Sequence, residues 1–357
     1  MMVVVFGSKH TDKEKKMRKA LAISVVLVLL CLGSLAQANI TMDTVTVGNP
    51  GNQADTLVMM LDGTTGYGSV SYAYNIGKYE VTAGQYTVFL NKVAATDTYG
   101  LYNPRMWDHE RGCRIQQSGS SGNYTYSVAS EWASRPVGFV SYWDSCRFAN
   151  WLHNGQPTGL QGPLTTEDGA YAMNGYNGTD GRTIQRTSGW KWAVTSEDEW
   201  YKAAYYKGGG ANAGYWDYPT SSDRAPGQDM ADLSGNNANF FTAPYAYPID
   251  SGKYTTGVGE FQKSDSPCGT FDQGGNVWEW NEANVYIEGS NACRGYRGGS
   301  YQWDYFTLHA ANRKYSPPTS EFDSVGFRVS AAIPEPSSFL TLALGLGSLP
   351  AIRRRTL

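Results

Sequence analysis

The segment GGNVWEW, residues 274–280, restricts the fold more than any other part of the chain. Its two glycines lead into Val277, Trp278, Glu279 and Trp280, and the side chains of a β-strand alternate between its two faces. A carboxylate among such apolar residues is costly to bury unless it is hydrogen-bonded, paired or bound to a metal. The segment therefore predicts a buried strand in which Glu279 either accepts from backbone N–H groups or binds a metal ion.

Three segments upstream of this strand carry the start pattern of an α-helix. In each, a hydroxyl residue is followed three positions later by an acid or an amide, which is the arrangement of a capping box. Apolar residues follow at helical spacing, and a short run typical of a strand precedes each segment. The capping pairs are Thr82 with Gln85, Ser141 with Asp144, and Ser196 with Glu199.

The composition is that of a globular protein with long loops. The chain has 357 residues, of which 41% are hydrophobic and 17% are charged, and its formal net charge is −3. It is long enough for one large domain, which we place at residues 39–332. Residues 154–189 and 206–250 are rich in Gly, Asn, Ser and Thr and predict loops. The lack of a basic excess argues against nucleic acid or another polyanion as a partner.

The N-terminal residues 1–38 have the order of a signal peptide. The basic stretch KEKKMRK precedes the apolar run ALAISVVLVLLCLGSL, and AQA ends at Ala38. Met17 lies just before the apolar run and is the translation start that this arrangement favours. A membrane anchor is the alternative, but the run is shorter than the roughly 20 residues that a spanning helix needs. We therefore expect an exported protein.

The C-terminal residues 333–357 resemble the PEP-CTERM sorting signal of Gram-negative bacteria. A Pro-Glu-Pro turn precedes an apolar run over 339–352 and then three arginines, 353–355. The resemblance implies transient association with the inner membrane, processing by an exosortase-type protease, and release or anchoring at the cell exterior. A weak permanent anchor is the alternative, because the apolar run is too short to cross a bilayer comfortably.

Four cysteines remain after removal of the signal peptide. An even number in an exported protein predicts two disulfides, and four cysteines allow three connectivities. Proximity along the chain favours Cys113 with Cys146 and Cys268 with Cys293. There is no CxxC motif, and His109, His153 and His309 lack the spacing of zinc ligands, so neither zinc nor histidine-bound iron is supported.

The order of six motifs resembles the formylglycine-generating enzyme, or sulfatase-modifying factor, family over roughly residues 76–328. The resemblance implies an α+β fold similar to an elaborated C-type lectin fold, with short helices, antiparallel strands and much irregular loop. It also implies an activity, since known members oxidise a sulfatase cysteine to formylglycine with oxygen and a copper ion held by two thiolates. The motifs are IGKYEVTAGQYTVFLN, RPVGFVSYWDSCRFANWL, TSEDEWYKAAYY, GGNVWEW, RGGSY and VGFR.

The chain departs from this family at the two catalytic thiols. The resemblance places one cysteine three residues after GGS and the other five residues later, where this sequence has Trp303 and Leu308. Neither side chain binds copper, so copper is not expected and the oxidase centre is predicted to be missing. The chain is therefore predicted to be a binding or structural module at the cell surface. We expect a groove for an extracellular polysaccharide or protein, lined by Ser300, Trp303, His309 and Arg313. The alternative is an active formylglycine-generating oxidase, or another oxidase on the same fold.

The same resemblance implies two calcium sites. Calcium prefers several oxygen ligands at flexible distances, and the residue types at the matching positions provide them. The first set is Asp272, Gly275, Val277 and Glu279. The second and weaker set is Asn239, Phe240, Asp250 and Gly252.

Several other residues have structural and functional alternatives. We expect Glu80 to close a hydrogen-bond network where a strand meets a helix. Arg297, Arg313 and Arg328 are expected to pair with carboxylates in a loop-rich core, although Arg313 could instead hold an anionic ligand. The rings near Trp303 fit either a core or a ligand platform. His109 and Glu110 fit solvated loop positions better than an acid–base pair.

Overall fold

The computed structural model describes residues 38–210, 212–242, 252–285 and 291–334. The chain divides into two units, residues 1–38 and 39–357, and the fold below is that of the second. The predicted signal peptide, apart from Ala38, and the sorting signal from residue 335 lie outside the described residues. Within the described ranges, no helix has both the length and the apolar character needed to cross a membrane.

The three predicted helices form, and each begins with the predicted capping box. They are α2 (Ala83–Val93), α4 (Tyr142–His153) and α5 (Glu197–Tyr205). In each box the hydroxyl accepts from the backbone N–H three residues on, and the acid or amide accepts from the N-cap N–H, which satisfies donors that the first turn leaves unpaired. The shorter helical elements are α3 (Arg105–Asp108), η1 (Ser130–Trp132), η2 (Gly181–Thr183) and η3 (Tyr305–Leu308).

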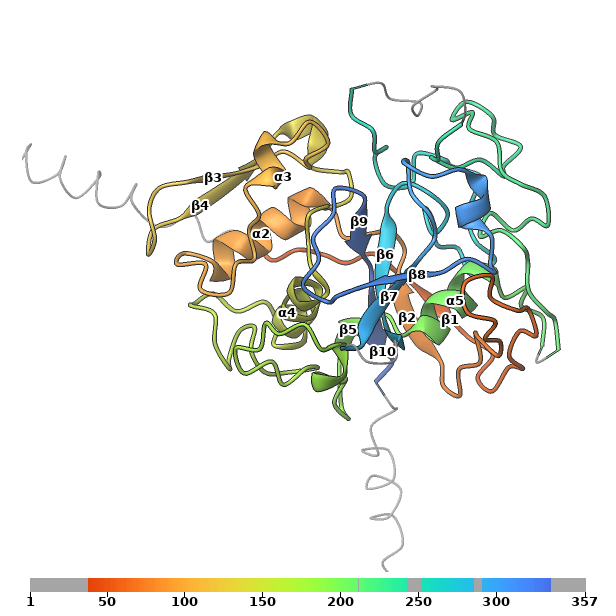
Figure 1. Ribbon diagram of the computed structural model, residues 1–357, viewed down its shortest axis with the longest axis horizontal. Helices are drawn as coiled ribbons and strands as arrows, with labels where there is room; N and C mark the ends of the chain where they lie inside the picture. Colours follow the sequence, from red (N-terminus) through yellow and green to blue (C-terminus); the bar gives the residue numbers. More distant parts are fainter. Residues whose placement is uncertain (1–37, 211, 243–251, 286–290, 335–357) are drawn as a thin grey trace, which may run out of the picture. The chain divides into compact units, whose positions relative to one another are not determined.

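Two four-stranded sheets and a hairpin complete the fold (Figure 1). The first sheet has the order β1-β2-β10-β5 and is antiparallel. The second has the order β8-β7-β6-β9, in which β6 and β9 are parallel. The hairpin β3-β4 contacts α2. The strands are β1 (Thr44–Val47), β2 (Tyr74–Gly77), β3 (Ile115–Ser118), β4 (Thr125–Val128), β5 (Trp192–Val194), β6 (Trp278–Val285), β7 (Cys293–Arg297), β8 (Lys314–Ser316), β9 (Val325–Phe327) and β10 (Val329–Ala332). This arrangement agrees with the expected α+β class of short helices, mainly antiparallel strands and long loops.

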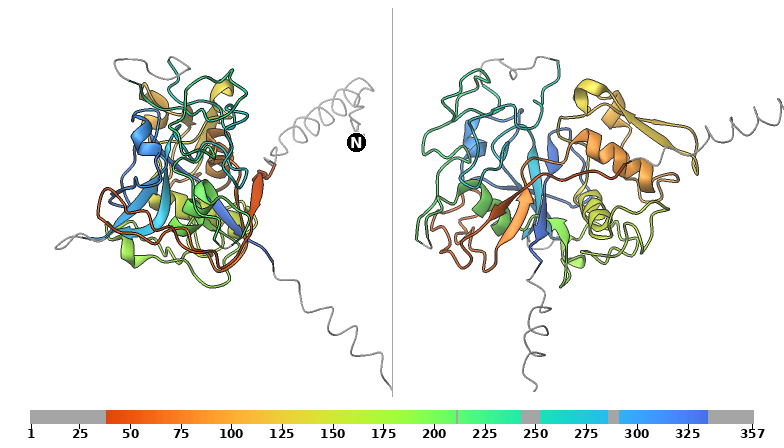
Figure 2. Two further views of the ribbon diagram at one scale, coloured as in Figure 1. Left: turned by 90° about the vertical axis from the view of Figure 1, so that its right-hand side faces the viewer. Right: turned by 180° about the vertical axis from the view of Figure 1, so that it is seen from behind.

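The main core lies where α2 and α4 meet the sheets. Front and back views place these two helices on one side of the sheets and α5 on the other (Figures 1 and 2). Phe148 of α4 contacts Phe89 of α2 and Phe327 of β9 edge-on, with ring centroids 5.3 Å apart in both pairs. Every residue of α4 from Tyr142 to Leu152 is buried, because the 154–189 connection covers the face that would otherwise meet solvent. Aromatic rings thus supply the apolar area that such short elements need.

The chain passes from the second sheet to the first at Arg328, the residue between β9 and β10. Its guanidinium is fully buried and contacts Glu279 of β6 through Nε and Nη2, each 2.5 Å from a carboxylate oxygen. It also donates to the carbonyls of Gly77, at the end of β2, and Phe271. The expected pairing of Arg328 with a carboxylate is confirmed, and this pair joins the two sheets.

The two predicted disulfides are not present. Cys113, Cys146, Cys268 and Cys293 are all free, because each sulfur lies in its own environment. Cys113 Sγ is 3.8 Å from the Gly138 carbonyl and Cys268 Sγ is 3.9 Å from the Lys202 carbonyl. Cys146 lies within α4 and Cys293 within β7. These thiols act as small apolar side chains.

A second buried acidic contact lies at the N-terminus of α4. Glu321 hydrogen-bonds to Asp144, the acid of the capping box, and accepts from the Asn103 amide at 2.5 Å. Burial, and after it the charge of Asp144, raise the pKa of Glu321 to about 8. Two carboxyl groups in contact favour one shared proton, so Glu321 is the protonated partner at neutral pH.

Replacing Glu279 should show how far stability depends on the Arg328 pair. We expect Glu279→Gln to lower the free energy of unfolding by about 3–5 kcal/mol, because it leaves a buried guanidinium without its counter-charge. Urea unfolding followed by tryptophan fluorescence measures the change. Glu110→Gln is the control, since Glu110 pairs with Arg111 at 3.4 Å with 67% of its side chain exposed. Equal effects of the two substitutions would contradict the central role of the pair.

Glu321→Gln should flatten the pH dependence of stability. The folded state raises the pKa of Glu321 from 4.5 to about 8, so the folded chain holds this proton more tightly than the unfolded chain. The contribution to stability is therefore complete below pH 4.5 and is lost as the pH rises toward 8. The amide of Gln keeps a donor to Asp144 and does not titrate. Between pH 5 and 9, the urea midpoint should fall less with rising pH for Glu321→Gln than for the wild type. Glu131→Gln, at an exposed position, is the control and should fall as much as the wild type. A parallel decline in all three proteins would contradict this assignment.

Candidate functional site

A cavity lies between one loop, the start of α5, the end of β6 and β8. Its volume is about 590 Å³. The loop contributes residues 61–67, α5 contributes its first residue, and β6 its last three. Segments far apart in the sequence therefore form its wall. The lining residues are Leu61, Asp62, Thr64, Tyr67, Glu197, Ala283, Asn284, Val285, Arg313 and Tyr315.

Arg313 is the central charge of this cavity. It is 6% exposed, and its Nη2 atom is 3.1 Å from Glu197 Oε2 while Nη1 is 3.5 Å from Asp62 Oδ2. Nη1 also donates to the hydroxyl of Tyr67. Its Nε atom is buried and has no partner among the described residues. One N–H of the guanidinium thus has no hydrogen-bond partner there, and it is shielded from solvent.

Glu197 is held by two arginines, which fixes its position. Its Oε1 atom accepts from Arg297 Nε at 2.7 Å, while Oε2 faces Arg313. Glu197 is the first residue of α5, where the helix dipole favours a carboxylate. The expected pairing of Arg297 and Arg313 with carboxylates is confirmed, and both share this one acid.

Asp62 completes a charge-balanced group of two carboxylates and two arginines, in which Arg313 lines the cavity and Arg297 is buried behind Glu197. Burial alone would raise the pKa of Asp62, but hydrogen bonds from Thr64 and the charge of Arg313 outweigh burial and lower it. Asp62 is therefore ionised at neutral pH. The lining offers fixed donors and acceptors, two tyrosines and no histidine, cysteine or serine. The lining therefore offers fixed hydrogen-bond donors and acceptors to a polar ligand.

Exposed aromatic side chains lie in the segment 303–306, which precedes Arg313 in the chain. Trp303 is 45% and Phe306 is 55% exposed, and Tyr305 stacks on Phe306 with ring centroids 4.3 Å apart. The Lys314 ammonium lies 3.1 Å from the centre of the Trp303 ring. The sequence left two environments open for these rings, a core or a ligand platform. In the structure, Trp303 and Phe306 lie at the surface.

The link between this surface and the cavity runs through the segment 311–313. The Asn312 side chain donates to the Phe306 carbonyl, and the Met60 backbone N–H donates to the Ala311 carbonyl at 3.0 Å. Met60 precedes Leu61 of the cavity wall, and Arg313 follows Asn312. The aromatic surface is therefore connected to the cavity wall through Asn312 and Met60.

The structure places the four predicted groove residues in different environments. Ser300 is fully buried, and its hydroxyl accepts from the Gln302 N–H at 3.3 Å. His309 lies edge-on to Tyr218, its Nδ1 accepts from the Ala311 N–H at 3.1 Å, and its Nε2 is 3.8 Å from Asp217. Trp303 belongs to the aromatic surface, and only Arg313 lines the cavity.

The position expected for the second thiol belongs to the core. Leu308 is fully buried and clusters with Tyr218, Ala238 and Phe240, while Trp303 is exposed at the position of the first thiol. The thiols that the chain does have are held protonated, since burial raises the pKa of Cys113 and of Cys268 to about 11. A copper ion held by two thiolates does not fit these residues. Over the described part of the chain, no group of three or more His, Cys, Asp or Glu side chains could hold a metal.

Glu279 does not fit the role of a calcium ligand in this arrangement. Both of its oxygens face the Arg328 guanidinium, and Oε2 also accepts from Trp200 Nε1 at 2.7 Å. A cation at 2.5 Å opposes a divalent ion on the same carboxylate. Asp272 of the same set forms no ion pair with an arginine among the described residues, and its Oδ2 accepts from the Gly259 N–H at 2.6 Å. The backbone of Gly275 packs on Asn239, where an added Cβ would lie 2.2 Å from the Asn239 carbonyl oxygen.

The second predicted calcium set lies partly outside the described residues, because Asp250 is not described. Asn239 Oδ1 is buried without a partner, and its amide donates to the Tyr254 carbonyl at 3.0 Å. The Phe240 carbonyl accepts from the Gln228 amide. Among the described side chains of this set, that of Asn239 offers one oxygen without a partner. The second calcium site stays a prediction.

Sequence reasoning missed most of the cavity. Asp62, Tyr67 and Glu197 were not recognised, since they come from separate segments that no motif connects. The capping box that begins α5 was the one available signal, because it fixes Glu197 at the first turn. The expectation for Glu80 was wrong: no neighbouring group donates a hydrogen bond to either of its carboxyl oxygens in the described structure.

Comparison with known proteins identifies the fold. The family model described as "Sulfatase-modifying factor enzyme 1-like domain" matches residues 45–333. The crystal structure of CarF is similar at 21% identity and a TM-score of 0.51, covering 82% of this chain and 99% of that one. Treponema denticola variable protein 1 is similar at 20% identity and a TM-score of 0.51, covering 82% and 96%. No curated protein matches the chain in sequence. At these identities the two structures establish the fold alone.

Proposed function

Because the chain belongs to the family of sulfatase-modifying factor enzyme 1-like domains, we propose that it is an exported binding module that keeps the family's fold without the oxidase centre. Its export, its processing by an exosortase-type protease and its place at the cell surface follow from the two terminal signals expected from the sequence. The cavity around Arg313 is the observation that carries the proposal of binding. Its charges are fixed by mutual pairing, so they can orient a ligand without a large reorganisation.

The proposed ligand is an extracellular polysaccharide. Sugar hydroxyls both donate and accept, which matches the carboxylates of Asp62 and Glu197, the Arg313 side chain and the Asn284 amide that line the cavity. The wall is charge-balanced, so a neutral ligand leaves no charge uncompensated. Trp303 and Phe306 offer apolar faces next to the cavity, on which further sugar rings can pack. A chain longer than the cavity would thus contact both parts of the face.

Arg297 supports this site from behind the cavity wall, without touching the ligand. Arg297 is fully buried, donates to the Ala310 and Asn312 carbonyls, and holds Glu197 against Arg313. The same contacts fix the loop that carries the exposed rings. The cavity and the aromatic surface therefore keep their relative positions, which reduces the entropy lost on binding.

Loss of Arg313 should weaken polysaccharide binding. A charge-assisted hydrogen bond contributes about 1.5–3 kcal/mol, so we expect Arg313→Met to raise Kd about tenfold or more. Isothermal titration with soluble fragments of bacterial exopolysaccharides measures the change, and Arg224→Met, at an exposed position outside the cavity, should bind like the wild type. Circular dichroism verifies the fold, and Arg313→Lys tests whether the fork or only the charge matters. Unchanged binding by Arg313→Met, or binding only to protein ligands, would refute the proposed ligand.

The purified chain should not generate formylglycine. We expect no aldehyde when it is incubated with copper, oxygen and a peptide that carries a sulfatase-type cysteine motif, because Trp303 and Leu308 stand where the two thiolates are needed. Mass spectrometry of the peptide gives the readout, and an active formylglycine-generating enzyme is the positive control. Turnover at a catalytic rate would establish the oxidase alternative instead.

A further inference from the structure

Lys314 carries a positive charge that no carboxylate balances in the described part of the chain. Its ammonium lies 3.1 Å from the centre of the Trp303 ring and 5.4 Å from that of Trp278. Among the described residues these ring contacts are the only interactions of the ammonium, and Nζ is accessible to solvent on a partly buried side chain. Burial lowers the pKa of Lys314, because the ammonium has lost part of its hydration. An anionic group would therefore meet a cation that is held in place and poorly solvated.

Lys207 shows the same ring contact with its charge balanced. Its ammonium lies 4.3 Å from the centre of the Trp216 ring, and it also pairs with Asp223 at 3.6 Å. The two lysines thus share an indole contact and differ in their counter-charge. A tryptophan contact is therefore no substitute for an anion, and Lys207 gives a matched control for Lys314.

Lys314 and Arg313 point to opposite faces of the second sheet. Successive residues of a strand face opposite sides, and Arg313 and Tyr315 line the cavity while Lys314 lies between them in the chain. Lys314 pairs with Tyr296 of β7, on the side where the Tyr296 ring packs against Trp278. Because β8 is an edge strand, the two faces meet at one rim. A polymer that crosses this rim can contact the cavity on one side and Lys314 on the other.

The segment before β8 adds exposed rings to the side of Lys314. Trp303 is 45% exposed, Phe306 is 55% exposed, and Tyr305 stacks on Phe306. Asp304 lies between these rings in the chain, but its Oδ1 atom accepts from the Phe306 N–H at 3.1 Å, and no ion pair joins it to Lys314 among the described contacts. The C–H faces of neutral sugars pack on such rings. One cation and several rings suit a ligand with both acidic and neutral units.

The other charges of this region restrict how many acidic units the ligand can carry. Arg313 is already committed to Glu197 and Asp62. The chain as a whole has a formal net charge of −3 and offers no basic excess. Closely spaced acidic units would bring further anions toward Asp62 and Asp304, where like charges repel. The ligand should therefore carry one acidic unit among several neutral ones.

We propose that Lys314 binds the acidic unit of a heteropolysaccharide through a carboxylate or sulfate group, while Trp303 and Phe306 pack against its neutral units. The inference rests on the proposed function and names the class of polysaccharide, in which neutral sugars separate the acidic ones. The anion replaces hydration that the ammonium has lost, and it forms charge-assisted hydrogen bonds with it. The ligand's charge is thus recognised outside the charge-balanced cavity.

The experiment compares forms of one oligosaccharide by isothermal titration with the purified full chain. The acidic form carries a single glucuronate in each repeat of otherwise neutral sugars, and in the reduced form that carboxyl group is converted to a hydroxymethyl. We expect the acidic form to bind about tenfold more tightly. An oligomer of glucuronate alone should bind more weakly than the acidic form. A sulfated version of the reduced form shows whether sulfate can replace the carboxylate.

Lys314→Met should remove the preference for the acidic form. We expect Kd for the acidic form to rise about tenfold, and Kd for the reduced form to change less than about twofold. Lys207→Met is the matched control and should keep the full preference, because its charge is already paired with Asp223. Circular dichroism verifies the fold of each variant.

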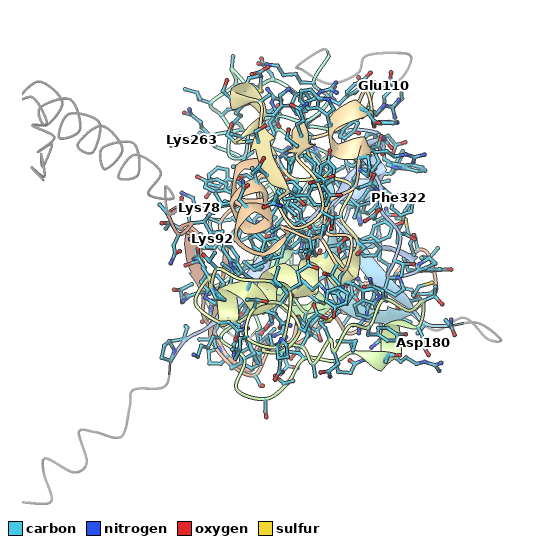
Figure 3. All side chains as sticks on the ribbon, turned by 90° about the vertical axis from the view of Figure 1, so that its left-hand side faces the viewer. Lys78, Lys92, Glu110, Asp180, Lys263 and Phe322 are labelled. Atoms are coloured by element: carbon cyan, nitrogen blue, oxygen red, sulfur yellow. The ribbon has the colours of Figure 1, made fainter. Side chains whose placement is uncertain are left out.

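A remote lysine tests for a general effect of net charge. The side chain of Gln302, the residue before Trp303, donates to Asp323 at 2.7 Å, so the neighbouring Phe322 marks the edge near the exposed rings. Lys92 lies at the opposite edge of the unit from Phe322 in Figure 3. Lys92→Met should therefore bind the acidic form like the wild type.

Salt provides a measurement that decides the question even if Lys314→Met fails to fold. Raising sodium chloride from about 0.05 to 0.5 M should weaken wild-type binding of the acidic form several-fold and hardly change that of the reduced form, because salt screens an accessible ion pair. Equal affinity for the two forms, or an undiminished preference in Lys314→Met, would overturn the inference. The proposed function would stand in that case if Arg313→Met still weakened binding, whereas no binding of any form would overturn both.

Discussion

The buried contact between Arg328 and Glu279 is the interaction on which the arrangement of the two sheets depends. Arg328 occupies the single residue between β9 and β10, so the chain changes sheet at this guanidinium. Glu279 belongs to β6 and also accepts from Trp200 of α5, while the arginine reaches the end of β2. Elements from both sheets and from a helix therefore converge on one ion pair. A wider apolar contact could not impose such a fixed register, because apolar contacts lack direction.

Buried arginines perform a general task in this fold. The long loops leave many carbonyl groups without a ladder partner, and each such group must be hydrogen-bonded if it is buried. Arg297 donates to Ala310 and Asn312, and Arg294 donates to Glu282, Gly181 and Ile184. The charge of each fully buried pair is balanced within the core, as in Arg297 with Glu197 and Arg328 with Glu279. Guanidinium forks thus replace backbone pairing where the loops are irregular.

Local features could be predicted from the sequence, and long-range ones could not. The capping boxes form as predicted, because Thr82, Ser141 and Ser196 find their partners within one helical turn. The need of Arg297 and Arg328 for carboxylates was also predictable from charge alone. Which acid each would take depends on tertiary contacts, and so Glu197 and the cavity were missed. The disulfides were inferred from an even count and the expected compartment, neither of which specifies where the sulfur atoms lie.

Leu308, at the position where the sequence predicts that a family thiol would lie, has a packing role. Leu308 fills a cluster with Tyr218, Ala238 and Phe240, and a Cβ on Gly299 would lie 2.6 Å from its Cδ1 atom. Gly299 also has a positive φ of 78°, so both its backbone and the space beside it favour glycine. A cysteine at position 308 would leave part of this cluster empty, which destabilises a close-packed core. The motif RGGSY therefore has a structural role that does not require the oxidase chemistry, and the same turn holds the exposed Trp303 and Phe306 beside the cavity.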